Sequence, residues 1–373
     1  MPETVVLKFG GTSVRDDSSM EAAVVHVRRS VEEGKRTVVV VSAMGREGEP
    51  YATDSLINLM RSTGEPVSPR ELDLAMSTGE ILSAAFFAHF LTMNEIPACA
   101  FTGQQAGFIT DDTAGTAEIL EVRPTKIQEA LDSGLVTVVA GFQGADEAGT
   151  TRTLGRGGSD TSAVALGAAL DAAEVEIYSD VDGVALCDPR RIPEAPFLTE
   201  IGANQLLAMA EEGSVILHPR AVRVAQEKKM SIRIRNTFTQ MPGSVIHHRP
   251  TTTNPNPISL AHQGKQILVH TLKEQNSAKE LPELLDAGNG RFLLLDDVYA
   301  DIRLKQLGEK YGDISEERGW GTVSVIFAGK SEENAPELPD AEKVRSPSDR
   351  WRYLLREEQI TPTLNTLFKL FFT

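Results

Sequence analysis

Residues 1–250 alternate between short β-branched runs and longer segments with helical spacing, and this alternation constrains the fold more than any other feature. Buried strands are predicted at 4–9, 37–43, 135–140, 174–179 and 231–236. Helices are predicted at 18–34, 68–93 and 159–173. Because strands joined through a helix run parallel in one sheet, this order predicts an α/β fold with a mostly parallel sheet and helices on both faces.

The predicted helices carry signals at their ends. Ser18 fits an N-cap, and Gly34 fits the position just past the end of the same helix. In the helix at 68–93, Leu82, Phe86 and Phe90 lie on one stripe. These signals support the helical assignment of both segments.

The segment TTTNPNP at 251–257 is polar, β-branched and interrupted by proline, which predicts a domain boundary. We therefore expect one domain at 1–250 and a smaller α+β domain at 258–373. In the second domain, strands are predicted at 265–272, 291–298, 300–304 and 321–329 around a helix at 278–288. The tail at 330–350 has a loop-like composition, whereas the apolar end at 361–373 is expected to pack against other elements.

The composition excludes several classes of function. The chain carries a formal net charge of −16, and phosphate binding needs clustered Lys and Arg, so we expect no nucleic-acid partner. Cys99 and Cys187 lie far apart, which favours a reducing compartment and excludes a disulfide framework. Because we see neither a signal-peptide pattern nor an apolar run of about 20 residues, we expect a cytoplasmic protein without a membrane partner.

The strand at 4–9 leads into an unusual motif, LKFGGTSV. Gly10 and Gly11 follow the strand directly, where the missing Cβ lets backbone N–H groups approach an anion. Ser13 adds a hydroxyl donor at a predicted helix start. Lys8 lies on an otherwise apolar strand, where its desolvation is costly unless an anion partners it. The motif predicts an anion site, and the alternative is a tight turn beside a lysine that reaches solvent.

A second glycine-rich motif, TLGRGGSDTSAVALGAAL, spans 153–170. Its glycines surround Arg156 and lead into a helix that opens with Ser159 and Asp160. Arg156 is poorly placed for packing but well placed for bidentate binding of a carboxylate or phosphate. Asp160 by itself also fits a simple N-cap. The motif therefore predicts another anion site at a helix start.

Polar residues also follow the strand at 174–179, in YSDVDGVALCDPRR. Ligands of open α/β sheets bind outside the carboxyl ends of the strands, so Ser179 and Asp180 are predicted ligand contacts. Asp182 and Asp188 fit turn chemistry equally well.

Glu80 lies among small and apolar residues of the helix at 68–93. A carboxylate in that setting needs a cation, such as a substrate amine, and the alternative is an acid that stabilises the first turn of a helix. His218 precedes a proline at a predicted helix start and is interpreted as structural. The other histidines show no partner spacing, so we predict no metal site among the side chains and no nucleophile–base pair.

The motifs LKFGGTSV, TLGRGGSDTSA, SDVDGV…DPR, ILHPRAV and IRIRNTF…PGSVI occur in the order found in aspartokinases, members of the amino acid kinase superfamily. The resemblance covers about residues 4–248 and depends on the combination of motifs. It implies a three-layer αβα sandwich, the amino acid kinase fold, followed by a smaller ACT-like domain for regulation or dimerisation. The implied reaction converts L-aspartate and MgATP to 4-phospho-L-aspartate and ADP, and the implied assembly is a homodimer.

The resemblance also implies roles for the residues that match the motifs. Lys8, together with the N–H groups of Gly10 and Gly11, would hold the transferring phosphate. Arg156 would bind the α-carboxylate of the substrate, and Glu80 would bind its ammonium group.

The remaining implied roles divide between acceptor and nucleotide. Ser42, Thr53 and Ser159 would line the aspartate pocket, and Asp160 would orient Lys8 or the substrate amine. The residues expected to contact the nucleotide or its phosphates also include Ser13, Ser179, Asp180 and Arg190.

Two positions depart from the family pattern. Ala185 stands where similar enzymes have an aromatic residue near adenine, and Val215 stands where they have a lysine. The segments at 265–272 and 321–330 resemble ACT strands, but the continuation of a second ACT module is absent. Two alternatives therefore stay open: a kinase for another carboxylate, such as glutamate or an aspartate analogue, and a non-catalytic amino acid-binding subunit.

Overall fold

The computed structural model describes most of the chain as two compact units. The described residues are 2–46, 48–64, 66–249, 257–271, 284–297, 300–311, 313–328, 335–344 and 346–372. Unit 1 consists of Met1–Val184, Phe197–Ala203 and Leu217–Arg249, and unit 2 of Ala185–Pro196, Asn204–Ile216 and Pro250–Thr373. Residues 251–256 of the expected domain boundary lie outside the described residues.

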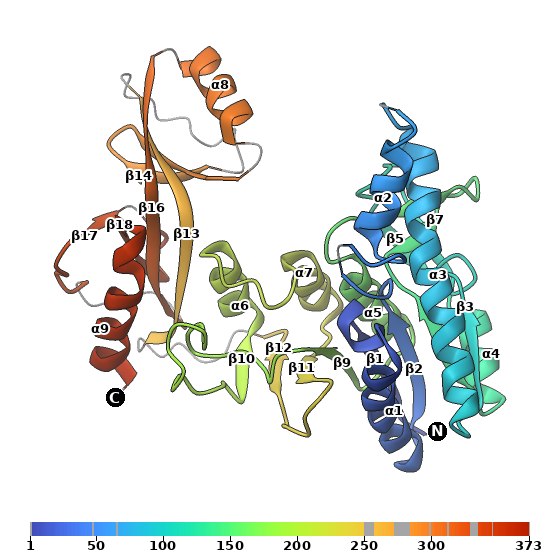
Figure 1. The fold of residues 1–373 in the computed structure, drawn as a ribbon. Coiled ribbons are helices and arrows are strands. Elements are labelled where there is room, and N and C mark those ends of the chain that lie inside the picture. The colour runs from blue at the N-terminus through green and yellow to red at the C-terminus, as the bar shows by residue number, and fades with distance from the viewer. Residues whose placement is uncertain are drawn as a thin grey trace. The chain divides into compact units, whose positions relative to one another are not determined.

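Unit 1 is built on an eight-stranded sheet with the order β10-β12-β11-β9-β1-β2-β6-β3 (Figure 1). All neighbouring strands are parallel except β11 and β12. The strands are β1 Thr4–Phe9, β2 Arg36–Val41, β3 Ala98–Phe101, β6 Val136–Ala140, β9 Glu174–Ser179, β10 Glu200–Gly202, β11 Ile232–Asn236 and β12 Ser244–His247. The predicted mostly parallel sheet and its five predicted strands are confirmed.

Alternation along β1 separates the two layers that cover the sheet. Val5, Leu7 and Phe9 pack in a core with residues of α1 (Asp17–Glu32) and α3 (Pro69–Met93). Val6 and Lys8 lie on the opposite face, which is covered by α5 (Gly158–Ala169). The αβα layering predicted from the sequence is therefore present, and it directs Lys8 toward the start of α5.

The helix ends and faces differ from the predictions in two places. Asp16, not Ser18, caps α1, because its carboxylate accepts the N–H of Ser19. On α3, Leu82 and Phe86 are 40% and 42% exposed, so the predicted stripe is not the buried one. The face of α3 that packs inward carries Met76, Ser77, Glu80, Ser83, Ala84, Phe87, Ala88 and Leu91.

Helix α3 is also long and apolar enough to cross a membrane by length and composition, which the sequence analysis did not anticipate. Half of its most apolar window is buried inside unit 1, where it packs on the sheet. This is the environment of a core helix.

Four short strands form a second sheet in unit 1, with the order β5-β4-β7-β8. The strands are β4 Phe108–Thr110, β5 Ile119–Val122, β7 Gln143–Ala145 and β8 Thr151–Thr153. The other helices of unit 1 are α2 Thr53–Arg61, α4 Thr125–Asp132 and α7 Pro219–Lys228, whereas α6 Ala203–Glu211 belongs to unit 2 from Asn204 onward. His218 caps α7 by accepting the N–H of Arg220, which confirms its structural interpretation.

Unit 2 contains a six-stranded antiparallel sheet with the order β14-β15-β13-β16-β18-β17. Its strands are β13 Pro257–Thr271, β14 Leu285–Gly288, β15 Arg291–Leu295, β16 Ile314–Phe327, β17 Ala341–Val344 and β18 Arg350–Arg356, and its other helices are α8 Ala300–Tyr311 and α9 Ile360–Phe372. Helix α9 buries Ile360, Leu364 and Leu367, as expected for the apolar end. The smaller α+β fold is confirmed.

Two local predictions in unit 2 are wrong. Residues 300–304 belong to helix α8 and not to a strand, because Ala300, Leu304 and Leu307 pack together at helical spacing. The segment 285–288 is strand β14 and not helix, while 278–283 lie outside the described residues.

Strand β17 lies in the tail at 330–350 that was expected to be loop-like, and β18 begins at its last residue and continues where no element was predicted. Six consecutive residues of β18 are buried, but two of them, Arg350 and Arg352, are charged, which conceals the strand in the sequence. Both arginines form ion pairs with the fully buried Glu212, at 3.1 and 2.5 Å. Burial alone would raise the pKa of Glu212, but Arg352, the Ser324 hydroxyl and Arg350 hold it below its usual value. A buried ion-pair network therefore stands where a hydrophobic pattern would have revealed a strand.

We expect Glu212→Ala to destabilise unit 2 by about 3–5 kcal/mol, because it leaves two buried guanidinium groups without their shared counter-charge. Glu211 is the matched control: its exposed side chain also contacts Arg350, so Glu211→Ala should cost less than about 1 kcal/mol. Both tryptophans of the chain, Trp320 and Trp351, lie in β16 and β18, so urea unfolding followed by tryptophan fluorescence reports on unit 2. Equal losses of stability in the two variants would contradict this assignment.

Candidate active site

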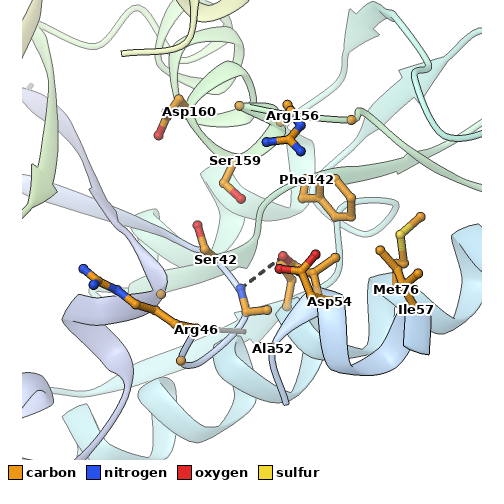
Figure 2. Close-up of a pocket in the computed structure, with 18 of the residues that line it drawn as sticks. Ser42, Arg46, Ala52, Asp54, Ile57, Met76, Phe142, Arg156, Ser159 and Asp160 are labelled. Atoms are coloured by element: carbon orange, nitrogen blue, oxygen red, sulfur yellow. Dashed lines mark hydrogen bonds between the residues drawn. The ribbon is translucent and has the colours of Figure 1, made fainter. Parts of the chain in front are cut away.

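A cavity of about 590 Å³ opens in unit 1 where β1, β2 and the start of α5 come together (Figure 2). Its walls come from several segments that are distant in the sequence. Eight residues predicted to bind substrate or phosphate line it: Lys8, Gly11, Ser42, Thr53, Glu80, Arg156, Ser159 and Asp160. The tertiary structure thus brings most of the predicted site residues into one cavity.

Lys8 supplies a buried cation on the central strand. β1 lies between β2 and β9, and the Lys8 side chain is only 11% exposed. Its Nζ lies 2.6 Å from Oδ1 of Asp160, in the first turn of α5. Asp160 is therefore not the N-cap, a position that Gly157 occupies. A buried ammonium needs such a partner, and the pair faces a cavity in which an anion can reach the same cation.

Of the two glycines after β1, Gly11 is required by close approaches of backbone, whereas Gly10 leaves space beside the Lys8 ammonium. A Cβ on Gly11 would lie 2.6 Å from the Gly45 carbonyl oxygen and 2.7 Å from that of Ala43. A Cβ on Gly10 would lie 3.7 Å from Nζ of Lys8. The glycine pair thus lets the loop after β2 pack against the loop after β1 and leaves the ammonium uncovered.

Glu80 is a carboxyl group with one oxygen left open. Its Oε1 accepts the N–H of Ala43 at 3.1 Å, whereas Oε2 is buried and has no hydrogen-bond partner among the described residues. Burial raises the pKa of Glu80 to about 8, against the opposing effects of the Ala43 N–H and the Lys8 ammonium. Glu80 lies in the middle of α3, so the alternative of a first-turn acid is wrong. A buried oxygen without a donor is a suitable site for a ligand's N–H or ammonium group.

Arg156 supplies the opposite charge at the other side of the cavity. It is exposed, and no ion-pair partner is found for it within the described ranges. The flanking Gly155 and Gly157 have φ of +73° and +69°, and a Cβ on Gly157 would lie 2.2 Å from Cβ of His218. The guanidinium therefore projects from a tightly held loop and is free to bind a carboxylate or phosphate.

Neighbouring residues hold the Arg156 loop in place. The buried Asp73 of α3 accepts the Thr153 hydroxyl at 2.5 Å and the N–H of Gly115 at 3.0 Å. Arg220 of α7 donates to the carbonyl oxygens of Leu154 and Ala117. The loop is thus anchored to two helices just before the residue that reaches the cavity.

Five predicted nucleotide or phosphate contacts do not line the cavity: Gly10, Ser13, Ser179, Asp180 and Arg190. The Gly10 N–H donates to the Tyr178 carbonyl oxygen at 3.3 Å. Ser13 is fully buried, and its hydroxyl lies 2.6 Å from that of Thr237. Asp180 forms an ion pair of 2.7 Å with Arg46, a residue that does line the cavity. Ser179 ends β9 and accepts the Thr237 N–H through its carbonyl oxygen.

Arg190 belongs to unit 2, where it forms a two-point ion pair with Asp188. Asp188 also bonds Nε2 of His262 at 3.1 Å. Burial alone would raise the pKa of Asp188, but the hydrogen bonds from Arg190 and His262 lower it to about 2. The predicted contact between Arg190 and a nucleotide stays a prediction.

Sequence reasoning missed several residues that line the cavity, including Arg46, Asp54, Ile57, Met76 and Phe142. Figure 2 shows Arg46 and Arg156 on opposite sides, with Ser42 and Ser159 between them. Met76 could have been found, since it lies one turn before Glu80 on α3. Phe142 has a positive φ of 68°, an unusual backbone state that the sequence does not reveal.

Within the part of the chain that the structure describes, no three His, Cys, Asp or Glu side chains gather as metal ligands. Mg²⁺ commonly takes only one or two protein carboxylates and otherwise binds water and substrate phosphates. These residues therefore fit a magnesium ion that arrives on a nucleotide, and they offer no resident cation cage.

Residues 3–236 match the model of the amino acid kinase family. The chain is 46% identical over 246 residues to aspartokinase 1 of Bacillus subtilis, covering 65% of this chain and 61% of that protein. It is 46% identical over 242 residues to the aspartokinase of Thermus thermophilus, covering 65% and 58%. The aligned part thus spans about three fifths of the length of these relatives.

Solved structures give the same result for the fold. Aspartokinase III of Escherichia coli, in complex with aspartate and ADP, matches with a TM-score of 0.76 and 23% identity over the full length of both chains. Aspartate kinase from Synechocystis matches with a TM-score of 0.59 and 27% identity over 99% of this chain and 69% of that one. With its parallel sheet, glycine loops and buried lysine, the chain belongs to the amino acid kinase family.

Proposed function

We propose that this chain is an aspartate kinase, which transfers the γ-phosphoryl group of ATP to the side-chain carboxylate of L-aspartate. One observation carries the proposal: a single cavity presents the open oxygen of Glu80, the unpaired guanidinium of Arg156 and the buried ammonium of Lys8. These groups complement the ammonium and α-carboxylate of an amino acid and the phosphate of a nucleotide. Relatives of 46% identity that are named aspartokinases support aspartate as the acceptor.

The chemistry asks little of the protein beyond positioning. A carboxylate is already a nucleophile at neutral pH, so no general base is needed, and phosphoryl transfer depends on alignment and charge neutralisation. Lys8 and the N–H group of Gly11 would face the transferring phosphoryl group, whereas the Gly10 N–H donates to the Tyr178 carbonyl oxygen. Asp160 would hold the Lys8 ammonium in place before ATP arrives.

The acceptor would bind between Glu80 and Arg156. Arg156 would form a two-point contact with the α-carboxylate, and Glu80 would accept the ammonium group. Ser42, Thr53 and Ser159 would supply hydroxyl groups to the side-chain carboxylate, which leaves its second oxygen directed at ATP.

The nucleotide side of the proposal rests on fewer contacts. Ser179, Asp180 and Arg190 would bind the nucleotide, as the motif resemblance implies. Mg²⁺ carried by ATP would neutralise charge on its phosphates. Ala185 and Val215, which replace an aromatic residue and a lysine of the family pattern, both belong to unit 2.

We also propose a role for unit 2, an oligomeric state and a cellular location. The antiparallel sheet of unit 2 with α8 and α9 supports an ACT-like domain, which would serve regulation or dimerisation of a homodimer. We place the protein in the cytoplasm, without a membrane partner.

The reaction is tested by measuring ADP release with a panel of amino acids. We expect aspartate to be preferred over glutamate, and Lys8→Ala to lower kcat by about 100-fold or more, because a charge that stabilises the transition state is lost. Turnover with glutamate but not with aspartate would identify glutamate as the acceptor. Tight binding of aspartate without ADP formation would instead identify a non-catalytic subunit.

Arg156→Lys keeps the charge but removes the fork that can bind both oxygens of a carboxylate. We expect the KM for aspartate to rise about 10-fold, which corresponds to about 1.4 kcal/mol, while the KM for ATP stays unchanged. Arg70→Lys is the matched control, since Arg70 is exposed and pairs only locally with Glu71. If Arg156→Lys raised the KM for ATP and not the KM for aspartate, Arg156 would instead be a nucleotide-binding residue.

Aspartate binding should depend on pH through Glu80. With its pKa near 8 the free carboxyl group is mostly protonated at neutral pH, and a bound ammonium group favours the carboxylate, so binding releases a proton. Apparent affinity should therefore rise by up to about 10-fold per pH unit between about pH 6 and pH 8 and flatten above. Calorimetry in buffers of different ionisation enthalpy counts this proton, and Glu80→Gln should abolish its release. Binding without proton release in the unsubstituted protein would refute the role of Glu80.

A further inference from the structure

The turn that follows β11 contacts the loop after β1 from the side away from the cavity. We call residues 10–14 the glycine loop. Its Ser13 hydroxyl lies 2.6 Å from the Thr237 hydroxyl, although 224 residues separate them in the sequence. Both residues are buried, with 0% and 1% of their surface exposed. Ser13 therefore faces Thr237 and not the cavity that the neighbouring Gly11 lines.

Thr237 is held on two further sides by its own backbone. Its N–H donates to the carbonyl oxygen of Ser179 at 2.9 Å, at the end of β9. Its carbonyl oxygen accepts Nε2 of the fully buried His26, also at 2.9 Å, from α1. The Thr237 hydroxyl is thus a fixed point attached to a strand and a helix of unit 1.

The same turn is braced by Asp182. Its Oδ1 accepts Nδ2 of Asn236 at 2.9 Å and the hydroxyl of Thr239 at 2.8 Å. These contacts lie beside Thr237 but do not touch the glycine loop. Removing one of them therefore tests the stability of the turn without removing its contact with Ser13.

The glycine loop contains a 3₁₀ turn at Gly11–Val14, and Val14 is buried in the core of unit 1. The Gly10 N–H donates to the Tyr178 carbonyl oxygen at 3.3 Å, and the Gly11 carbonyl oxygen accepts the Gly45 N–H at 3.1 Å. In the described part of the chain, the contact between Ser13 and Thr237 is the one side-chain hydrogen bond that this loop makes. Because its glycines have no side chains to pack, this bond and the burial of Val14 are the side-chain contacts that fix their position relative to Lys8.

We propose that Thr237 is a positioning residue for phosphoryl transfer, whose hydroxyl holds Ser13 and thereby sets the N–H group of Gly11 beside the Lys8 ammonium. The inference rests on the proposed function and makes Ser13 a support of the phosphate site. A small displacement of a binding loop can cost a large factor in rate, because transition-state stabilisation requires fixed donors. The hydrogen bonds of Thr237 join it to Ser13, Ser179 and His26, and not to Arg156 or Glu80. Loss of its hydroxyl should therefore weaken ATP binding or lower kcat and leave aspartate binding unchanged.

The test compares Thr237→Val, which removes the hydroxyl at nearly constant volume, with Thr237→Ser, which keeps it. We expect Thr237→Val to weaken binding of the non-hydrolysable analogue AMP-PNP with Mg²⁺, or to lower kcat, by about 10-fold or more. The dissociation constant for aspartate should stay within about two-fold, and Thr237→Ser should restore both nucleotide readouts. The matched control is Thr239→Val, which removes a hydroxyl from the same turn without touching Ser13.

Several results would overturn the inference. One is a folded Thr237→Val protein with unchanged AMP-PNP binding and kcat. Another is an equal loss of affinity for aspartate and for AMP-PNP in this variant. A third is a Thr239→Val protein that loses as much AMP-PNP affinity or kcat as Thr237→Val. If Thr237→Val does not fold, Ser13→Ala removes the same bond from the other side and must show the same selective loss. AMP-PNP binding needs no acceptor, so it reports on Thr237 even if the protein has no kinase activity. A wild-type protein that binds AMP-PNP but shows no turnover would refute the proposed aspartate kinase, and the Thr237 variants would still test the role of Thr237 in nucleotide binding.

Discussion

The site depends on one ion pair, between Lys8 in the middle of the parallel sheet and Asp160 in the first turn of α5. An ammonium on a central strand cannot be buried without a counter-charge. The start of a helix is a favourable place for that carboxylate, because the helix dipole stabilises negative charge there. The pair therefore joins sheet and helix at the floor of the cavity, and the glycines around it keep the cation accessible.

The rest of the cavity presents polar groups that have no complete partner among the described residues. Glu80 is buried with one oxygen open, and Arg156 projects from a loop held by Asp73 and Arg220 without an ion pair among the described residues. Leaving buried polar groups unsatisfied is unfavourable in the free protein and becomes favourable when a ligand of opposite charge binds. A molecule with an ammonium and a carboxylate group is the simplest ligand that satisfies both residues.

Unit 2 uses buried charge for a different purpose. Glu212 is closed in by Arg350, Arg352 and Ser324, so every charge there is paired and no cavity is needed. The contrast is physical: a network with complete pairing stabilises packing, whereas incomplete pairing beside a cavity creates a binding site. The same contrast explains why β18 was not predicted from the sequence, since two of its six buried residues are arginines.

The sequence by itself determined the parallel sheet and the glycine loops, because strand periodicity, glycine pairs and helix starts are local patterns. These patterns indicated Lys8 and Arg156 as anion-binding groups, whereas the roles of Glu80 and Asp160 were implied by the resemblance of the combined motifs. Only the tertiary structure decided what depends on distant partners: the contact of Ser13 with Thr237, the positive φ of Phe142, and the pairing of Arg46 with Asp180. It also decided that 185–196 and 204–216 pack with unit 2. Such contacts join segments whose local patterns carry no information about each other.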